Sequence, residues 1–451
     1  MILKAFQASS LQALSTCIRF NKGRERGTSK IYLRGDTFME ATQKRINITL
    51  KDHVLFLSTV FCFWFATYIY IPTFSLYLET KQFTYSAIGI ILGSYGVTQV
   101  LLRFPLGILS DILHRLRKQL YIGGFAVAII SGLLLILFDS FFAIFTARLL
   151  AGITASMWVM ATILYAQYFH RGQSSRAMGT LQFLTVMPQF VSMALAGIIV
   201  QSFGWMLPFW IAVLASAVGL ILSCWINVVP QESTHQDERR SFNHYVRATI
   251  RVPSLLAITG LSMIGHGILF ITIFGFTPLY AATIGINEGT LFWLVMAFFI
   301  PHAVASLSLA FLPLHDRHTR HILLICLIAT GLSLILIPFT NTLASLSIDH
   351  SILGLALGLF FPLLLGKIAS LPVDSLRTSV MGFYQSFYAL GIFLGPILAG
   401  TVAEWFGLPV MLWGGAFLAL LGIPLLLYAN HESTHKKRVG HNINWDGKTR
   451  K

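Results

Sequence analysis

The chain has 451 residues, of which 55% are hydrophobic and only 11% charged, and its mean hydropathy is +0.73. A soluble domain carries about 25% charged residues, so this composition excludes a water-soluble globule with a covered surface. The net charge of +15 is distributed in a way that favours contact with a membrane surface, and nucleic acid is not an expected partner.

Long stretches of the chain carry no charge at all. The 55 residues between Arg176 and Glu232 lack Asp, Glu, Lys and Arg, and so do the 36 between Arg251 and Glu288. A helix needs about 20 mainly apolar residues to cross a bilayer, and it satisfies its own backbone groups there. The pattern predicts an all-α polytopic membrane protein embedded in a lipid bilayer.

The first residues differ from the rest. Residues 1–50 form a basic tail, and residues 1–38 contain no apolar run of spanning length. A targeting peptide is one explanation, because the segment is basic, contains Ser and is poor in acids. The other is an incorrectly assigned start in a bacterial gene. We favour Met39 as the true start, because the sequence after it reads as a short tail leading into a first span.

Twelve spans follow, separated by turns with Gly, Pro and polar residues. The first six are expected at 54–78, 84–109, 119–138, 141–167, 177–201 and 206–228. The second six are expected at 254–281, 289–313, 321–340, 343–368, 378–402 and 408–429.

The spans form two groups. Residues 51–229 are expected to form one six-helix bundle and residues 253–430 another. A polar, charged linker at 230–252 separates them, and residues 431–451 form a basic tail. The loops on the same side of the membrane as the two termini are rich in Lys and Arg. The loops on the opposite side contain a single basic residue of these types, Lys81. We therefore expect a multi-pass protein of the inner (cytoplasmic) membrane. By the positive-inside rule, both of its termini lie in the cytoplasm.

The two groups of spans resemble each other. Residues 178–210 align with residues 381–413 without a gap and share ten identities. Among them are an Ala-Gly pair ending at Gly197 and Gly400, and a Phe-Gly pair before span six and span twelve. Span five therefore matches span eleven, as expected of two six-helix repeats.

The stretch "PLGILSDILHRLRK" at 105–118 resembles motif A of the major facilitator superfamily, which joins spans two and three. Its Gly107 and Asp111 sit where the motif has them, and three cations follow, Arg115, Arg117 and Lys118. The resemblance implies two bundles that rock about a central site, with this loop as a gating latch. An exposed ion pair is worth about 1 kcal/mol, which suits a latch that must open.

A related arrangement follows span eight. Asp316 precedes Arg317 and Arg320 there, as Asp111 precedes its own cations, so we expect a second-half analogue of the latch. Simple positive-inside charge is the alternative explanation for both loops.

Span four contains "ARLLAGITAS" at 147–156, which is similar to motif B of the same superfamily through Arg148 and Gly152. The resemblance implies a coupling role. A charge inside a span costs about 2.5–3.5 kcal/mol on insertion scales, so Arg148 is expected to face a cavity or a partner. No Asp or Glu lies in the middle of a predicted span, so no acidic partner is evident.

Span eleven carries a run whose spacing resembles motif C of proton-driven exporters. Its members, which we expect to serve helix packing or hinge motion, are Gly382, Gly391, Gly395, Pro396 and Gly400.

Several other side chains are candidates for a proton or substrate site. These candidates lie within spans and are titratable or aromatic: His266, His302, Tyr68, Tyr280 and Tyr384. Hydrogen-bonded packing is the alternative for each of them. Arg103 and Lys367 lie near span ends and are expected to extend to the cytoplasmic headgroups.

These observations predict a secondary transporter that moves a small organic solute by alternating access, as export coupled to protons. A uniporter or an importing symporter of the same fold is the alternative. A membrane enzyme fits less well, because no clustered catalytic arrangement is evident. A sensor without transport also fits less well, because Arg148 and most of motif A are present. No nucleotide-binding loop appears, and neither a cofactor nor a metal is expected. The resemblance implies a monomer.

Overall fold

The structure is a computed structural model that describes residues 48–109, 116–169, 174–229, 242–311, 316–369, 371 and 376–439. Two members of the predicted latch, Asp111 and Arg115, lie outside the described residues, and so does the segment around Met39. The description below concerns the unit that begins at Ile48.

The first half of this unit is entirely helical. Its helices are α2 Leu50–Tyr68, α3 Ile71–Thr80, α4 Tyr85–Leu109, α5 Arg117–Leu137, α6 Phe141–Ser156, α7 Trp158–Ala166, α8 Ser174–Phe203 and α9 Leu207–Cys224.

The second half repeats this pattern after a short linker helix, α10 Phe242–Ile250. Its elements are α11 Leu255–Ile271, the π-helix η1 Thr272–Phe276, α12 Thr277–Thr283, η2 Glu288–Thr290, α13 Leu291–Phe311, α14 Asp316–Leu336, η3 Ile337–Phe339, α15 Leu343–Ala369 and α16 Arg377–Val439.

The described residues contain twelve membrane crossings, as the sequence predicts. Eleven helical segments are long and apolar enough to span, and the last, Ser379–Tyr428, has 50 residues. Two spans need only about 40 residues. Gly407 breaks α16 with φ 84° and ψ 163°, so this segment crosses twice.

The break at Gly407 also explains the Phe-Gly pair that the halves share. Gly204 ends α8 with φ 83°, and Gly407 has φ 84°. Only Gly adopts this left-handed region without strain. The same turn therefore closes span five and span eleven, which confirms the two-repeat architecture inferred from the sequence.

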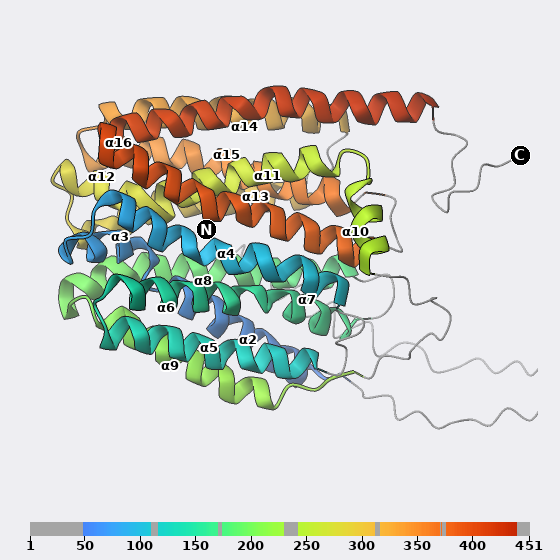
Figure 1. Cartoon of the computed structure of the whole chain (residues 1–451), viewed down its shortest axis with the longest axis horizontal. Helices are drawn as coiled ribbons and strands as arrows, with labels where there is room; N and C mark the ends of the chain where they lie inside the picture. Colours follow the sequence, from blue (N-terminus) through green and yellow to red (C-terminus); the bar gives the residue numbers. More distant parts are fainter. Residues whose placement is uncertain are drawn as a thin grey trace, which may run out of the picture. The chain divides into compact units, whose positions relative to one another are not determined.

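The helices lie side by side in two groups. Figure 1 shows α2 to α9 in the lower part of the unit and α11 to α16 in the upper part, with α4 running beside α16. We call the end with α10 the linker end and the end with the α3 and α12 termini the turn end. Large apolar side chains such as Leu101, Leu214 and Ile348 face outward, each more than 60% exposed, as a lipid-facing surface requires.

Three spans are broken part-way along their length. Span one breaks between α2 and α3, and span four breaks at Met157 between α6 and α7. Span seven contains the π-helix η1. Pro72 and Pro278 lie in the first turn of the helix after the breaks in spans one and seven, where proline is well tolerated. Broken spans of this kind surround the binding site in many transporters, and π-helices concentrate at functional sites.

Candidate functional site

Arg148 lies in α6 and is only 1% exposed. Its Nη1 donates to Tyr70 Oη over 3.0 Å. The guanidinium carbon lies 4.6 Å from the ring centre of Tyr95, 5.5 Å from that of Phe74 and 5.9 Å from that of Tyr70. Within the described residues, no carboxylate lies within ion-pair distance of Arg148. The charge is therefore held by aromatic faces and one hydroxyl.

The position of Tyr70 follows from the break in span one. It is the second of the two residues between α2 and α3 and caps the start of α3, and from there its hydroxyl reaches Arg148. Gly152, one turn after Arg148, lets α6 approach the backbone of α4. A side chain there would meet Tyr95 and Thr98. The two motif B residues thus bring the Arg148 cation beside the Tyr95 ring.

Arg103 contradicts the expectation that it extends to the headgroups. It lies in α4, is only 2% exposed and points between the two halves. Its Nη1 donates to Tyr388 Oη of α16 at 2.6 Å, and its Nη2 donates to the Ala155 carbonyl at 3.4 Å. Arg103 lies six residues before the end of α4. From there its side chain is long enough to extend either toward the headgroups or toward the second half. The Tyr388 hydroxyl and ring hold it inward.

On the other side of Tyr388 lies His266 of α11. The two rings are stacked, with centres 4.0 Å apart and an interplanar angle of 8°. His266 Nδ1 donates to the Ser262 carbonyl at 2.8 Å. Ser262 Oγ donates to Tyr384 Oη at 2.9 Å. Arg103 of the first half thus contacts a connected polar cluster of the second half.

The other predicted candidates lie at different places. The Tyr68 ring contacts Phe274 of η1 at 5.3 Å and lines the junction between the halves. His302 packs beside Phe298 and Phe361, and its Nδ1 has no hydrogen-bond partner in the part of the chain described. Tyr280 lies at the turn end, where its hydroxyl donates to the Thr340 carbonyl. That hydrogen bond stays within the second half.

Three residues of the predicted latch are described, and they lie in different surroundings. Gly107 lies against Gly382 of α16, where an added Cβ would come 3.2 Å from the Gly107 Cα. Arg117 is buried at the start of α5. Lys118 instead donates to the carbonyls of Cys224 and Ile226 at the end of α9. Lys118 therefore stabilises a helix C-terminus within the first half.

In the second-half analogue, α14 begins at Asp316, and Arg317 follows in its first turn. Arg320 is exposed on the same helix. Only the side chain of Arg320 is described among these three.

The glycines of span eleven face two different neighbours. An added Cβ at Gly391 or Gly395 would meet the backbone of Met263 or Gly267 in α11. Pro396 and Gly400 instead contact Gly89 and the start of α4. This face of α16 thus allows close backbone approach both within the second half and between the halves.

A buried ionisable pair at the turn end of α15 is not among the predicted site residues, although Asp349 is the acid that lies deepest in the predicted spans. Asp349 is 5% exposed and its Oδ2 has no hydrogen-bond partner among the described residues. His350 is fully buried, and its Nε2 lies 3.3 Å from Thr277 Oγ1. An ionisable residue inside a span marks a functional candidate. The sequence signal for this pair is that two adjacent ionisable residues interrupt a long apolar run.

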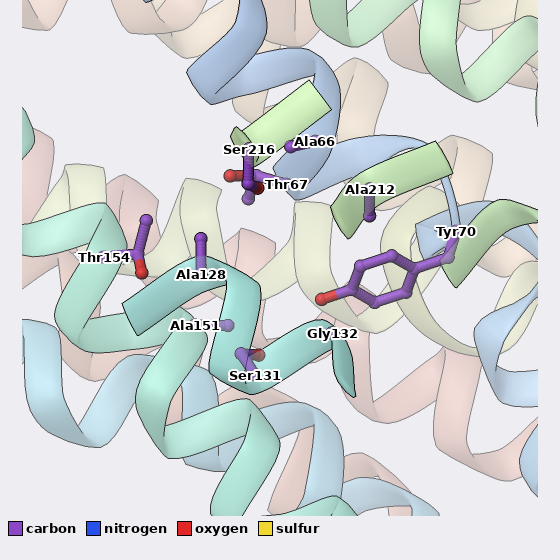
Figure 2. A pocket seen from close by; sticks show the side chains of 10 residues that line it. All are labelled: Ala66, Thr67, Tyr70, Ala128, Ser131, Gly132, Ala151, Thr154, Ala212 and Ser216. Atoms are coloured by element: carbon purple, nitrogen blue, oxygen red, sulfur yellow. The ribbon is translucent and has the colours of Figure 1, made fainter. Parts of the chain in front are cut away.

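A small cavity lies within the first half, where α2, α5, α6 and α9 meet (Figure 2). Small residues and hydroxyls line it, and Tyr70 points to its edge (Figure 2). Its volume is about 20 Å³, which is room for about one water. A cavity of this size is too small for an organic solute.

One ion pair lies at the turn end, outside the spans. Lys81 Nζ and Tyr77 Oη both donate to the Asp139 carboxylate, at 2.7 and 2.9 Å. These hydrogen bonds, first that from Lys81 and then that from Tyr77, hold the pKa of Asp139 below its ordinary value of 3.8.

Two repeated helical halves, broken spans and buried charges at their junction define a polytopic membrane transporter. The sequence profile of the Major Facilitator Superfamily matches residues 56–292 and residues 255–443. The chain therefore belongs to the major facilitator superfamily, and the predicted all-α fold with twelve spans is confirmed.

Individual relatives agree with this assignment. The chain is 31% identical over 154 residues to the inner membrane transport protein YajR of Escherichia coli (strain K12), a match that covers 34% of this chain and 33% of YajR. It is 24% identical over 300 residues to the uncharacterized MFS-type transporter YuxJ of Bacillus subtilis (strain 168), covering 64% of this chain and 74% of YuxJ.

Solved structures share the fold. A mutant of the nucleoside transporter NupG superposes with a TM-score of 0.69 at 17% identity, covering 84% of this chain and 100% of that one. The human organic anion transporter MFSD10 (TETRAN) gives 0.63 at 18% identity, covering 83% and 98%. At these identities the likeness concerns the fold alone.

Proposed function

We propose that this protein carries a small organic solute across the inner membrane by alternating access, and that the solute binds at the contact between Arg103, Tyr388 and His266, with Arg148 in a coupling role. The observation that carries the proposal is the hydrogen bond between Arg103 of the first half and Tyr388 of the second. A hydrogen bond to a charged group contributes about 1.5–3 kcal/mol. It is strong enough to hold one state and weak enough to be broken by solute.

We further propose that transport is export coupled to protons. The inference of export starts from the motif C spacing, which this chain carries in span eleven, whereas proton-driven exporters carry it in span five. His266, His302 and the Asp349–His350 pair supply protonatable groups within the spans, in a chain whose mid-span positions otherwise lack acids. A carrier without a coupling ion and a symporter are the alternatives that the experiment below separates.

The proposed latch contains fewer cations than the sequence motif, because Lys118 is bound to the end of α9. Gly107 and Gly382 let α4 and α16 touch at the linker end, beside the motif A loop. We propose that Asp111 with Arg115 and Arg117 pairs in one state and separates in the other, while Lys118 remains on α9. The linker end is proposed to face the cytoplasm, with both termini there, because the loops at this end hold most of the Lys and Arg. The carrier acts as a monomer in this proposal.

Proteoliposomes with a trapped pH dye test the coupling. Challenged with pooled small solutes, the wild-type protein is expected to move protons only when a solute is present. Arg148→Ala is expected to abolish that movement. Uptake of labelled solute without proton movement would refute proton coupling and leave a uniporter or a carrier coupled to another ion. Neither uptake nor proton movement with any pool would contradict the carrier proposal and favour a sensor.

A further inference from the structure

Two arginines in this structure carry more hydrogen-bond donors than the protein satisfies. A guanidinium has five N–H donors. Arg148 makes one hydrogen bond and Arg103 makes two, and the Nε of each is buried without a partner among the described residues. Both side chains are at most 2% exposed. Buried cations are normally paired or fully hydrogen-bonded, so these two lack an expected counter-group.

The protein does not supply that counter-group within the described residues. Asp139 is paired with Lys81 at the turn end. Asp349 lies in the second half, beside His350. The groups that contact the two arginines are aromatic rings, two tyrosine hydroxyls and the Ala155 carbonyl of α6, and the His266 ring lies behind Tyr388.

Both cations lie beside aromatic rings at the junction between the halves. Tyr95 lies under Arg148 and is stacked against Phe270 of the second half, with ring centres 6.0 Å apart. Tyr388 lies under Arg103 and against His266. Aromatic faces attract cations, which partly compensates each guanidinium. The same faces accept the flat apolar body of a ring-bearing solute.

We propose that the solute is an organic anion, namely a carboxylate or sulfonate on an aromatic body, and that its anionic group binds Arg103 in place of Tyr388, with Arg148 as a second cationic position along the path. This inference rests on the proposed carrier function. A planar carboxylate or sulfonate accepts two parallel hydrogen bonds from a guanidinium fork. Such a ligand satisfies the orphan donors and breaks the contact between the halves in the same step.

An anionic solute also gives the proposed export a driving force. One elementary charge crossing a membrane potential of 100 mV gains enough free energy for a concentration ratio of about 50-fold. An inside-negative cell therefore expels an organic anion through such a carrier even without a second ion.

The test compares three ligands of one shape that differ in charge: 1-naphthoate, 1-naphthamide and 1-naphthylmethylamine. Binding of tritiated 1-naphthoate to the full chain in nanodiscs is measured directly, and the other two compete. The wild-type protein is expected to prefer the anion over the amide by about 10-fold or more, the contribution of one charged hydrogen bond. Equal competition by the neutral or cationic ligand, or no naphthoate binding, overturns the inference.

Variants assign the effect to Arg103. Arg103→Gln is expected to remove the preference for the anion, and Arg103→Lys to retain it with weaker affinity. Tyr388→Phe frees the guanidinium and is expected to tighten naphthoate binding, which general damage to the fold would not do. Arg251→Gln, an exposed position outside the spans, is the matched control and should leave binding unchanged. Unchanged naphthoate binding in Arg103→Gln overturns the assignment.

The outcome is separable from the carrier proposal. Anion-selective binding without any rearrangement of the halves would refute the carrier proposal and leave the anion site intact. Rearrangement of the halves driven by neutral solutes, with no anion preference, would support the carrier proposal and refute the anion site.

Discussion

At the scale of single residues, Arg148 depends on one hydroxyl. Tyr70→Phe keeps the ring beneath the guanidinium and removes only the acceptor of the 3.0 Å hydrogen bond. A buried charged donor then loses its partner, so the free energy of unfolding should fall by about 1.5–3 kcal/mol. Steric-trapping measurements of unfolding in bicelles check this value. Tyr428→Phe, at an exposed tyrosine, is the control, and an equal effect there would contradict the account.

A second residue-scale prediction concerns pH. Because the pKa of the folded Asp139 carboxyl is depressed, its stabilising effect is complete above its ordinary value of 3.8 and is lost as pH falls through the lower, folded pKa. The pair is largely exposed, with Asp139 59% accessible, so it contributes at most about 1 kcal/mol. Asp139→Asn should lower the melting temperature in detergent more at pH 7 than at pH 3. Equal lowering at both pH values would show that the charge is irrelevant.

Residue positions differ in how well sequence alone predicts them. Arg148 could be predicted to face inward, because eight uncharged residues separate it from Asp139 at the outer end of span four and the stretch resembles motif B. Arg103 could not, because its distance from the helix end allows both directions. The choice depends on a tyrosine 285 positions away in the chain, and helix periodicity does not encode the rotation of α4 toward α16.

At the scale of elements, two matched contacts join the halves at the turn end. Gly197 of α8 lies against the Glu288 carbonyl at the start of span eight, and Gly400 of α16 lies against the Tyr85 carbonyl at the start of span two. These glycines occupy equivalent positions in the two repeats. The sequence revealed their equivalence, but their partners in the opposite half follow only from how the halves pack. Small residues at such crossings allow close backbone approach in membranes.

Leucine at either glycine should wedge the turn end open. An added side chain at Gly197 or Gly400 collides with backbone that cannot rotate away, and overpacking of this kind costs about 1–3 kcal/mol. We expect Gly197→Leu and Gly400→Leu each to raise the labelling rate of a cysteine near Trp205 by a membrane-impermeant maleimide. Gly123→Leu is the control, since nothing lies within 4 Å of a Cβ there. Unchanged labelling in both variants would mean that these contacts do not seal this end.

At the scale of the whole molecule, composition and repeat structure were enough to predict twelve spans in two bundles, because lipid forces every backbone group into helices. The predicted span at 141–167 corresponds to α6 and α7, and that at 343–368 to α15. The breaks inside spans one, four and seven were not predicted, because their sequences remain apolar throughout. The break in span one places Tyr70 against Arg148, and η1 places Phe274 against Tyr68 at the junction between the halves.

The central claim is that the halves rock about this junction, and paired distances measure it directly. Spin labels in a cysteine-free background at Lys51 and Gly366 report the linker end, and labels at Phe142 and Asn341 report the turn end; all four positions are exposed. Double electron–electron resonance is recorded in nanodiscs with and without transported solute. The account predicts two populations in which one pair lengthens as the other shortens. A single distance at each end, insensitive to solute, would contradict it.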